Sequence, residues 1–195
     1  LKGFKAPASE AAGLVDLLNE VSNEYATNVK ELAVGMAGLS PIARQMGFSM
    51  AETAGLLTPA IEVYRSGSEA ADALKTSLQQ LANDTKPVKA ALASIGVSQT
   101  DLNGQLRSGK DIFLDVARAM IGLTDAQKSY VTQQLVGIEQ AGRFGTVIND
   151  LGKYLAVTDT ALNSAGSAAK EVATRLDTAI GLSHVAIFKG NPVGM

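Results

Sequence analysis

The architecture of this chain is set by residues 47–74, which read GFSMAETAGLLTPAIEVYRSGSEAADAL. Ser49 is followed three residues later by Glu52, and Ser66 is followed three residues later by Glu69. In this spacing the serine oxygen accepts a backbone N–H of the first helical turn, while the glutamate reaches back to the capping residue. The stretch therefore predicts the junctions of successive helices, and it offers almost nothing that could perform chemistry.

Similar signals recur along the chain and predict a mainly α-helical protein, a multi-helix array. Pro41 should kink the second helix or split it near Ser40, because proline lacks a backbone N–H. Gly47 and Gly96 stand where left-handed helix ends are expected. The expected helices run from Pro7 or Ser9 through Val21, from Thr27 to Gln45, from Met50 to Tyr64 with Pro59 inside, over 67–82, from Pro87 to Gly96, over 111–122, from Thr124 to Val136, over 137–155 as one broken helix or two short ones, and over 163–181.

The helical period is interrupted by residues 97–111, which read VSQTDLNGQLRSGKD. Asn103-Gly104 lies between two leucines, and this pair is a two-residue hairpin signal because both positions tolerate positive φ. We therefore expect one small β-hairpin near Val97–Leu106, at about 97–107, as the only strand structure. RSGKD at 107–111 lacks the preceding glycine of a phosphate loop, so it is interpreted as the exit of the hairpin.

The composition points to thin helices with few large side chains. The chain is 46% hydrophobic but only 5% aromatic, with no Trp, so a compact core would be thin and an extended array or oligomer is indicated. The 17 basic residues are dispersed and the formal net charge is −2, so neither a phosphate-tracking stripe nor sequence-specific nucleic-acid binding is expected. The absence of cysteine excludes disulfides and thiolate metal sites. The apolar run at 32–43 is too short to span a bilayer.

No catalytic, cofactor-binding or metal-binding residue is expected, and the chain is not predicted to be an enzyme or to need a cofactor. His184 is the only histidine, and no nucleophile or carboxylate lies beside it in the sequence. Two carboxylate pairs, Glu20 with Glu24 and Glu52 with Glu62, are explained as helix caps or a solvated helix face. The aromatic residues are dispersed rather than gathered in a base-stacking platform, and are expected to anchor helices to each other: Tyr25, Tyr64, Tyr130, Phe144 and Tyr154.

The domain expectation is a helical domain over 1–181 and an extended or poorly ordered tail over 182–195, since LSHVAIFKGNPVGM has no helical period. The chain starts at Leu1 without an initiator Met or a signal sequence, so we expect it to be a segment of something longer.

Four segments, taken in order, carry a resemblance to a known family. They are LNEVSNEYATNVKELAVGMAGLSPIARQMGFSMAETAGLL (18–57), GSEAADALKTSLQQLAND (67–84), ALASIGVSQTDLNGQLRSGKDIFLDVARAMIGL (91–123) and NSAGSAAKEVATRLDT (163–178). Each contains helix junctions, and together they resemble the conserved core domain of phage tail tape measure proteins over residues 14–180. The chain departs from the family's Gly-Arg-rich segment, where GIEQAGRFGTVINDL is otherwise loose.

The resemblance implies a structural virion protein. Tape measure proteins form a long helical rod in the lumen of the tail tube, and tube subunits polymerise around it, so that its length sets the tail length. The rod leaves the tube before the DNA and assists DNA ejection. The implied partners are copies of itself with 3-fold or 6-fold symmetry, the tail tube protein, tail-tip hub proteins, tail assembly chaperones and the host inner membrane. The implied location is the virion, inside the tail tube or at the tail tip, and the host cytoplasm during assembly.

Three alternatives stay open. The first is a membrane-active helical module that oligomerises in the host envelope during DNA delivery, since Ala33 with Ala37 and Gly35 with Leu39 have the spacing of close helix contacts. Charged residues interrupt that run, which favours ordinary helix packing. The second is a muralytic enzyme, which would need a catalytic glutamate in a cleft or zinc ligands, and a single histidine without cysteine argues against zinc. The third is a secreted helical adhesin or effector, and the ordered family match argues against it.

Overall fold

Residues 2–166 are described by the computed structural model, and helices make up most of them. The mainly α-helical prediction is confirmed. The last expected helix beyond residue 166, the tail over 182–195 and His184 lie outside the described residues. The elements are two 3-10 turns, Lys2–Phe4 and Ala8–Glu10, and the helices α1 Ala11–Glu24, α2 Val29–Gln45, α3 Met50–Tyr64, α4 Gly67–Leu81, α5 Lys86–Ser94, α6 Gly109–Met120, α7 Asp125–Val136, α8 Ile138–Ile148 and α9 Leu151–Leu162.

The capping residues begin several helices as the sequence predicts. At α3 the Ser49 hydroxyl accepts the Glu52 N–H, and the Glu52 carboxylate accepts the Ser49 N–H at 2.8 Å, so the capping box is complete. Thr124 and Gln127 form a second complete box at α7. These reciprocal hydrogen bonds satisfy backbone donors that would otherwise lack partners in the first turn.

The start of α4 differs from the predicted box. Ser66 accepts the Glu69 N–H at 3.2 Å, as expected. A further carboxylate comes from another helix, because Glu31 of α2 accepts the Gly67 N–H at 2.7 Å. The first turn of α4 is therefore capped partly by a residue 36 positions away in the chain, and this tertiary contact is invisible to local spacing rules.

Other helix starts fall at residues that the sequence signals missed. Asn28, rather than Thr27, caps α2, with its side-chain oxygen accepting the Glu31 N–H at 2.9 Å. Pro7 precedes only a short 3-10 turn, so α1 begins later than expected. Ser108 caps α6 by accepting the Asp111 N–H, so α6 begins inside the stretch interpreted as a hairpin exit. In each capped case the side-chain oxygen reaches the N–H three residues on.

The two internal prolines do not split their helices. Pro41 lies inside α2 and Pro59 lies inside α3, and both helices continue past them. Buried residues on each side of Pro41, including Leu39 and Ala43, hold α2 in the core. Burial of these side chains overrides the local cost of a missing hydrogen bond. The predicted left-handed stop at the end of α2 is confirmed, since Gly47 has φ +92°.

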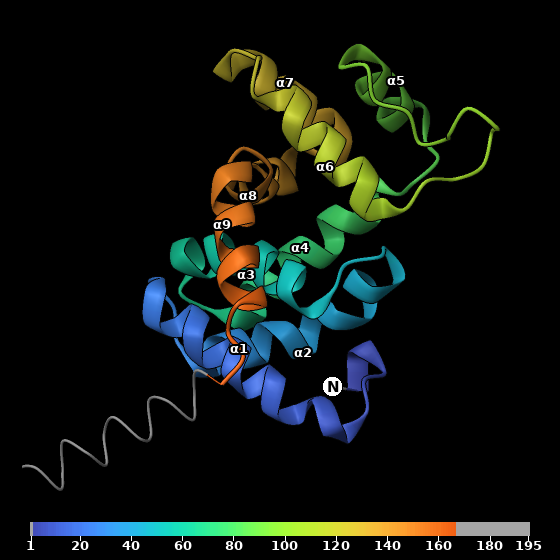
Figure 1. Ribbon diagram of the computed structural model, residues 1–195. Helices are drawn as coiled ribbons and strands as arrows, with labels where there is room; N and C mark the ends of the chain where they lie inside the picture. The colour runs from blue at the N-terminus through green and yellow to red at the C-terminus, as the bar shows by residue number, and fades with distance from the viewer. Residues whose placement is uncertain (1, 167–195) are drawn as a thin grey trace, which may run out of the picture.

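The helices form two groups connected by α4 and α9 (Figure 1). The helices α1, α2 and α3 lie at one end, while α5, α6 and α7 lie at the other (Figure 1). The helix α4 contacts α2 and α3 as well as α6, α7 and α8, and α9 contacts α1 and α3 as well as α6 and α8. The most extensive helix pairs are α3 with α9 and α2 with α4.

Glycines allow the backbones to approach at these two crossings. A Cβ at Gly67 in α4 would lie 1.9 Å from the carbonyl oxygen of Glu31 in α2. In α3, a Cβ at Gly55 would lie 2.8 Å from the carbonyl oxygen of Tyr154 in α9. Both distances are shorter than real Cβ contacts, so these positions require glycine.

The core is one continuous hydrophobic cluster that draws residues from α1 to α9. Alanine, valine and leucine supply most of this cluster, and the glycines at the α2–α4 and α3–α9 crossings let the helices approach each other closely. Phe113 lies at the centre of an aromatic group, with its ring centroid 5.7 Å from those of Phe48 and Tyr154 and 6.2 Å from that of Phe144. This group joins the α2–α3 turn to α6, α8 and α9.

The predicted β-hairpin is wrong, since residues 2–166 contain no β-strand and a single antiparallel bridge joins Thr100 to Leu106. The Asp101 carboxylate accepts the N–H groups of Asn103 at 2.8 Å and Gln105 at 2.9 Å, which closes a turn of a different type. Gly104 has φ +77°, but Asn103 does not adopt the positive φ that the predicted turn requires. No second pair of bridged residues extends the ladder in the described part, and such a short two-stranded ribbon is marginal alone.

Candidate interaction surface

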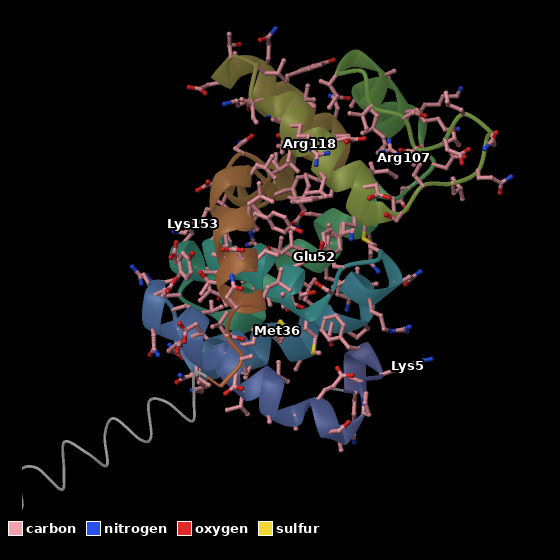
Figure 2. All side chains as sticks on the ribbon, viewed as in Figure 1. Lys5, Met36, Glu52, Arg107, Arg118 and Lys153 are labelled. Atoms are coloured by element: carbon pink, nitrogen blue, oxygen red, sulfur yellow. The ribbon has the colours of Figure 1, made fainter. Side chains whose placement is uncertain are left out.

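The carboxylates considered as candidate acids serve helix packing in this structure. Glu52 caps α3 and forms an ion pair with Lys110 of α6 at 3.2 Å. Glu62 of α3 accepts the Ala26 N–H at 3.2 Å and pairs with Lys153 of α9. Figure 2 shows Lys153 on α9 and Glu52 near the centre of the molecule, between the two groups of helices. These contacts connect elements that are far apart in the sequence.

Within residues 2–166, no cluster of histidine, cysteine, aspartate and glutamate has the arrangement to hold a metal ion. Burial and the nearby charge of Glu52 raise the pKa of the Tyr154 hydroxyl, so it stays protonated. Glu24 accepts a hydrogen bond from the Thr160 hydroxyl at 2.9 Å, which connects α1 to α9. The structure therefore brings these candidate residues into separate packing contacts rather than into one reactive site.

The aromatic residues mostly anchor helices, as expected. The hydroxyl of Tyr25, which follows α1, lies 3.3 Å from the Thr160 hydroxyl of α9, and the Arg143 guanidinium lies 5.9 Å from the ring centre of Tyr64. Phe144 and Tyr154 belong to the aromatic group around Phe113. The expectation is wrong for Tyr130, whose side chain is 63% exposed.

The residues considered for membrane insertion divide between the core and the surface of the fold. Gly35 and Leu39 are buried, and a Cβ at Gly35 would lie 3.0 Å from Leu57 of α3. Ala33 and Ala37 line a small hollow below the N-terminal 3-10 turn. No helix in the described part of the chain has the length and apolar character needed to cross a membrane.

Residues 98–107, here called the tip loop, project from the end of the molecule where α5, α6 and α7 lie (Figure 1). The loop displays two large apolar side chains to solvent: Leu102 is 106% exposed and Leu106 is 84% exposed. Its backbone is nevertheless held by hydrogen bonds, from Asp101 N–H to Gln105 and from Arg107 N–H to Gln99, each 2.9 Å long. The tip loop is thus an ordered element that exposes leucines.

Arg107 anchors the tip loop to α6. Its guanidinium donates to the Ser98 carbonyl at 2.9 Å and forms an ion pair with Asp115, which also accepts from Arg118 at 3.0 Å. Figure 2 shows Arg118 on α6 and Arg107 to its right, at the base of the tip loop. The hydrogen bond from Arg107 lowers the pKa of Asp115 below its usual value, although burial acts in the opposite direction.

Replacing Asp115 with asparagine should loosen the tip loop. We expect faster amide hydrogen exchange over 99–107 and a loss of about 1 kcal/mol or less, because the ion pair is partly exposed. In the wild type the stabilisation is fully present above about pH 3.8, the usual Asp115 value, and is lost as the pH falls through the lowered pKa. Asp125→Asn is the control, since Asp125 is fully exposed; equal exchange in both variants would contradict the anchor role.

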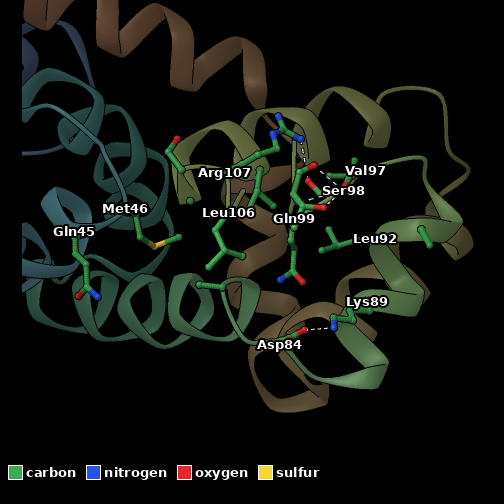
Figure 3. A pocket seen from close by; sticks show the side chains of 16 residues that line it. Gln45, Met46, Asp84, Lys89, Leu92, Val97, Ser98, Gln99, Leu106 and Arg107 are labelled. Carbon is green, nitrogen blue, oxygen red and sulfur yellow. Dashed lines mark hydrogen bonds and ion pairs between the residues drawn. The ribbon is translucent and has the colours of Figure 1, made fainter. Parts of the chain in front are cut away.

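Beside the tip loop lies a groove of about 810 Å³ (Figure 3). It lies between the C-terminal ends of α2 and α4, the helix α5 and the start of α6. Its apolar lining includes Met46, Leu92, Val97, Leu106 and Ile112. The Asp84–Lys89 ion pair lies at its outer edge (Figure 3).

Sequence reasoning missed this surface because it assigned the leucines to a hairpin. The signal available was the pair Leu102 and Leu106 in a segment without helical or strand period. Which side of such a segment faces solvent depends on the contacts of Arg107 with α6, and those are tertiary contacts.

The helix crossings and the internal ion pairs define a mainly helical protein whose charged side chains serve packing, with the tip loop and its groove exposed at the surface. The sequence profile of the phage-related minor tail proteins matches residues 1–137, and the chain belongs to this family. A minor tail protein is a structural component of the phage tail, which places the chain in the virion.

The chain is also similar to a tape measure protein of Pneumococcus phage Dp-1, with 25% identity over 173 residues. The match covers 89% of this chain and 15% of that relative. Together the two matches confirm the resemblance to tape measure proteins. No solved structure matches the chain.

Proposed function

We propose that this chain is the folded helical module of a tape measure protein, which sets tail length, scaffolds assembly of the tail tube and assists DNA ejection. The observation that carries the proposal is the similarity to a phage tape measure protein over 89% of the chain. The proposed location is the tail-tube lumen or the tail tip. The proposed partners are copies of the chain in 3-fold or 6-fold arrangement, the tube protein, tip hub proteins and assembly chaperones.

The shape of the module limits what it contributes to length measurement. The longest helix within residues 2–166, α2, has 17 residues and spans about 25 Å. The helices α1, α3 and α4 pack against it, so adding residues to this module would not add length in proportion. Since the chain spans 15% of the relative it matches, we propose that the ruler lies in other helices of the parent protein.

Tail length in the parent phage tests this proposal. An in-frame deletion of about 20 residues from helices that flank the module should shorten the tails by about 30 Å, at 1.5 Å per residue. A duplication of the same residues should lengthen them by the same amount. Electron microscopy of purified tails gives both values, and an unchanged length with normal assembly would contradict the proposal.

A deletion inside the module is the matched comparison. Removing a similar number of residues from α6 and α7 should abolish tail assembly rather than shorten the tail, because both helices belong to the common core. Normal tails shortened in proportion would show that the module itself acts as a ruler. We also propose that residues 1–181 form one domain, which limited proteolysis with a boundary near 181 would test.

A further inference from the structure

The Asn103-Gly104 pair of the tip loop has the chemistry of a self-modification site. Asn103 is the only asparagine in the chain that precedes a glycine. We propose that Asn103 deamidates without an enzyme, by attack of the Gly104 backbone nitrogen on its side-chain amide, and that the turn around Asp101 sets the rate. The proposal concerns the covalent chemistry of the tip loop and does not depend on the proposed tape measure function.

The reaction needs no co-reactant other than water. The Gly104 nitrogen loses its proton and forms a bond to Cγ of Asn103, the bond between Cγ and the amide nitrogen breaks, and that nitrogen leaves with the proton as ammonia. One water molecule then opens the resulting succinimide ring at either of its carbonyls. Opening at one carbonyl gives aspartate, and opening at the other gives isoaspartate, in which the main chain runs through the side chain. The balance is one water consumed and one ammonia released.

The structure leaves the pair accessible. Asn103 and Gly104 are both exposed, and they lie in the tip loop, which projects from the rest of the molecule (Figure 1). Gly104 carries no Cβ, and one built there would meet no atom within 4 Å, so neither its own side chain nor a neighbour obstructs the ring. The attack is favoured because the two reacting groups belong to adjacent residues and are already close together.

Other asparagines within residues 2–166 lack this combination, because the next residue carries a side chain in every case. Asn83 is also exposed, but Asp84 follows it. The Asn83 side-chain amide also donates to Gln80 at 3.0 Å. A side chain on the following residue crowds the attacking nitrogen, so we expect the reaction to be selective for Asn103.

The turn holds the attacking nitrogen in place and slows the reaction. The Gly104 N–H donates to the Asp101 carbonyl at 3.0 Å, so the nitrogen must leave this hydrogen bond before it attacks. The Asp101 carboxylate accepts the N–H groups of Asn103 at 2.8 Å and Gln105 at 2.9 Å, which fixes the residues on both sides of Gly104. Its negative charge also opposes the nitrogen anion that forms during the attack. Asp101 therefore sets the rate by holding the turn closed.

Deamidation would change both the charge and the shape of the tip loop. Residues 98–107 are neutral, with one aspartate and one arginine, and the new carboxylate would give them one net negative charge. In the isoaspartate form one methylene is added to the main chain between Asn103 and Gly104, which displaces the N–H groups of Gly104 and Gln105 from Asp101. The modification therefore alters the exposed loop beside the groove without touching the helical core.

Incubation of the purified chain at neutral pH, followed by tryptic peptide mapping, tests the proposal. The peptide 90–107 contains Asn103 as its only asparagine, and over weeks it should gain the mass difference between an amide and a carboxylic acid. Fragmentation by electron transfer should show more isoaspartate than aspartate, which is the signature of the succinimide route. Asn83 is the internal control and should stay unmodified over the same period.

Two variants separate the roles of the glycine and the turn. Gly104→Asn keeps a residue that tolerates the φ of +77° but adds a side chain beside the attacking nitrogen. It should slow deamidation of Asn103 by about tenfold, a barrier increase of about 1.4 kcal/mol. Asp101→Ala releases the turn and should accelerate the reaction about fivefold, a barrier decrease of about 1 kcal/mol that is typical of one lost hydrogen bond. Both variants should keep the circular dichroism of the wild type, because the substitutions lie outside the helices.

Three results would overturn the proposed reaction. They are an Asn103 that converts no faster than Asn83, a product that is aspartate alone, and an unchanged rate in the Gly104→Asn chain. An unchanged rate in the Asp101→Ala chain would overturn the role of the turn. Tail length is measured separately in the phage, so failure here leaves the proposed tape measure function intact.

Discussion

Replacing Gly67 with alanine should destabilise the protein by about 3 kcal/mol. The added Cβ would lie 1.9 Å from the Glu31 carbonyl oxygen and 3.0 Å from the Gly35 backbone nitrogen. Both are backbone atoms of α2, so no side-chain rotation relieves the clash and the two helices must separate. That separation also weakens the hydrogen bond from the Gly67 N–H to the Glu31 carboxylate. Thermal unfolding should show a midpoint about 10 °C lower, as expected for a chain of this size.

Gly142→Ala is the matched control for this experiment. Gly142 also lies in a helix, α8, but a Cβ at this position would meet no atom within 4 Å. Alanine should therefore stabilise the helix by about 0.5–1 kcal/mol, through its lower conformational entropy in the unfolded chain. Similar stabilities for the two alanine variants would contradict the close α2–α4 crossing.

Replacing Phe113 with alanine should cost about 3–5 kcal/mol. Phe113 is fully buried and contacts three aromatic rings from the α2–α3 turn, α8 and α9. Truncation leaves a cavity where the two groups of helices meet, and the edge contacts between rings are lost as well. Chemical denaturation measures the loss, and the near-ultraviolet circular dichroism of Tyr154 should weaken because its ring loses a fixed neighbour.

Tyr130→Ala provides the comparison, because it removes an aromatic ring that is 63% exposed. Its effect should stay within about 0.5 kcal/mol, as is usual for surface substitutions. Phe113→Leu should fall between the two, since leucine fills part of the cavity. Equal losses for Phe113→Ala and Tyr130→Ala would contradict the central position of Phe113.

Local signals predicted most helices in the described chain. The boxes at Ser49 and Thr124 act within four residues, so their geometry follows from spacing alone. Helix bounds failed where several capping residues stood side by side, as at Thr27 and Asn28. The alternative that Pro41 splits α2 is wrong, because burial of the neighbouring side chains outweighs one missing hydrogen bond.

The interaction surface was less predictable. The sequence indicated that residues 97–111 leave the helical period, but a hairpin was the wrong structure for them. The Asp101 carboxylate accepts two backbone N–H groups and so stabilises a different turn, while the ion pair between Arg107 and Asp115 holds the loop against α6. Leu102 and Leu106 are both exposed in this loop.

The sequence by itself determined the helical class, the main junctions and the resemblance to tape measure proteins, because those depend on residues close together in the chain. Only the tertiary structure decided which glycines are indispensable, which glutamate caps α4 and where the leucines of the tip loop point. These features arise between helices, where the distance between two backbones selects the residues. A periodic pattern specifies which face of a helix is buried, and only packing specifies its neighbour.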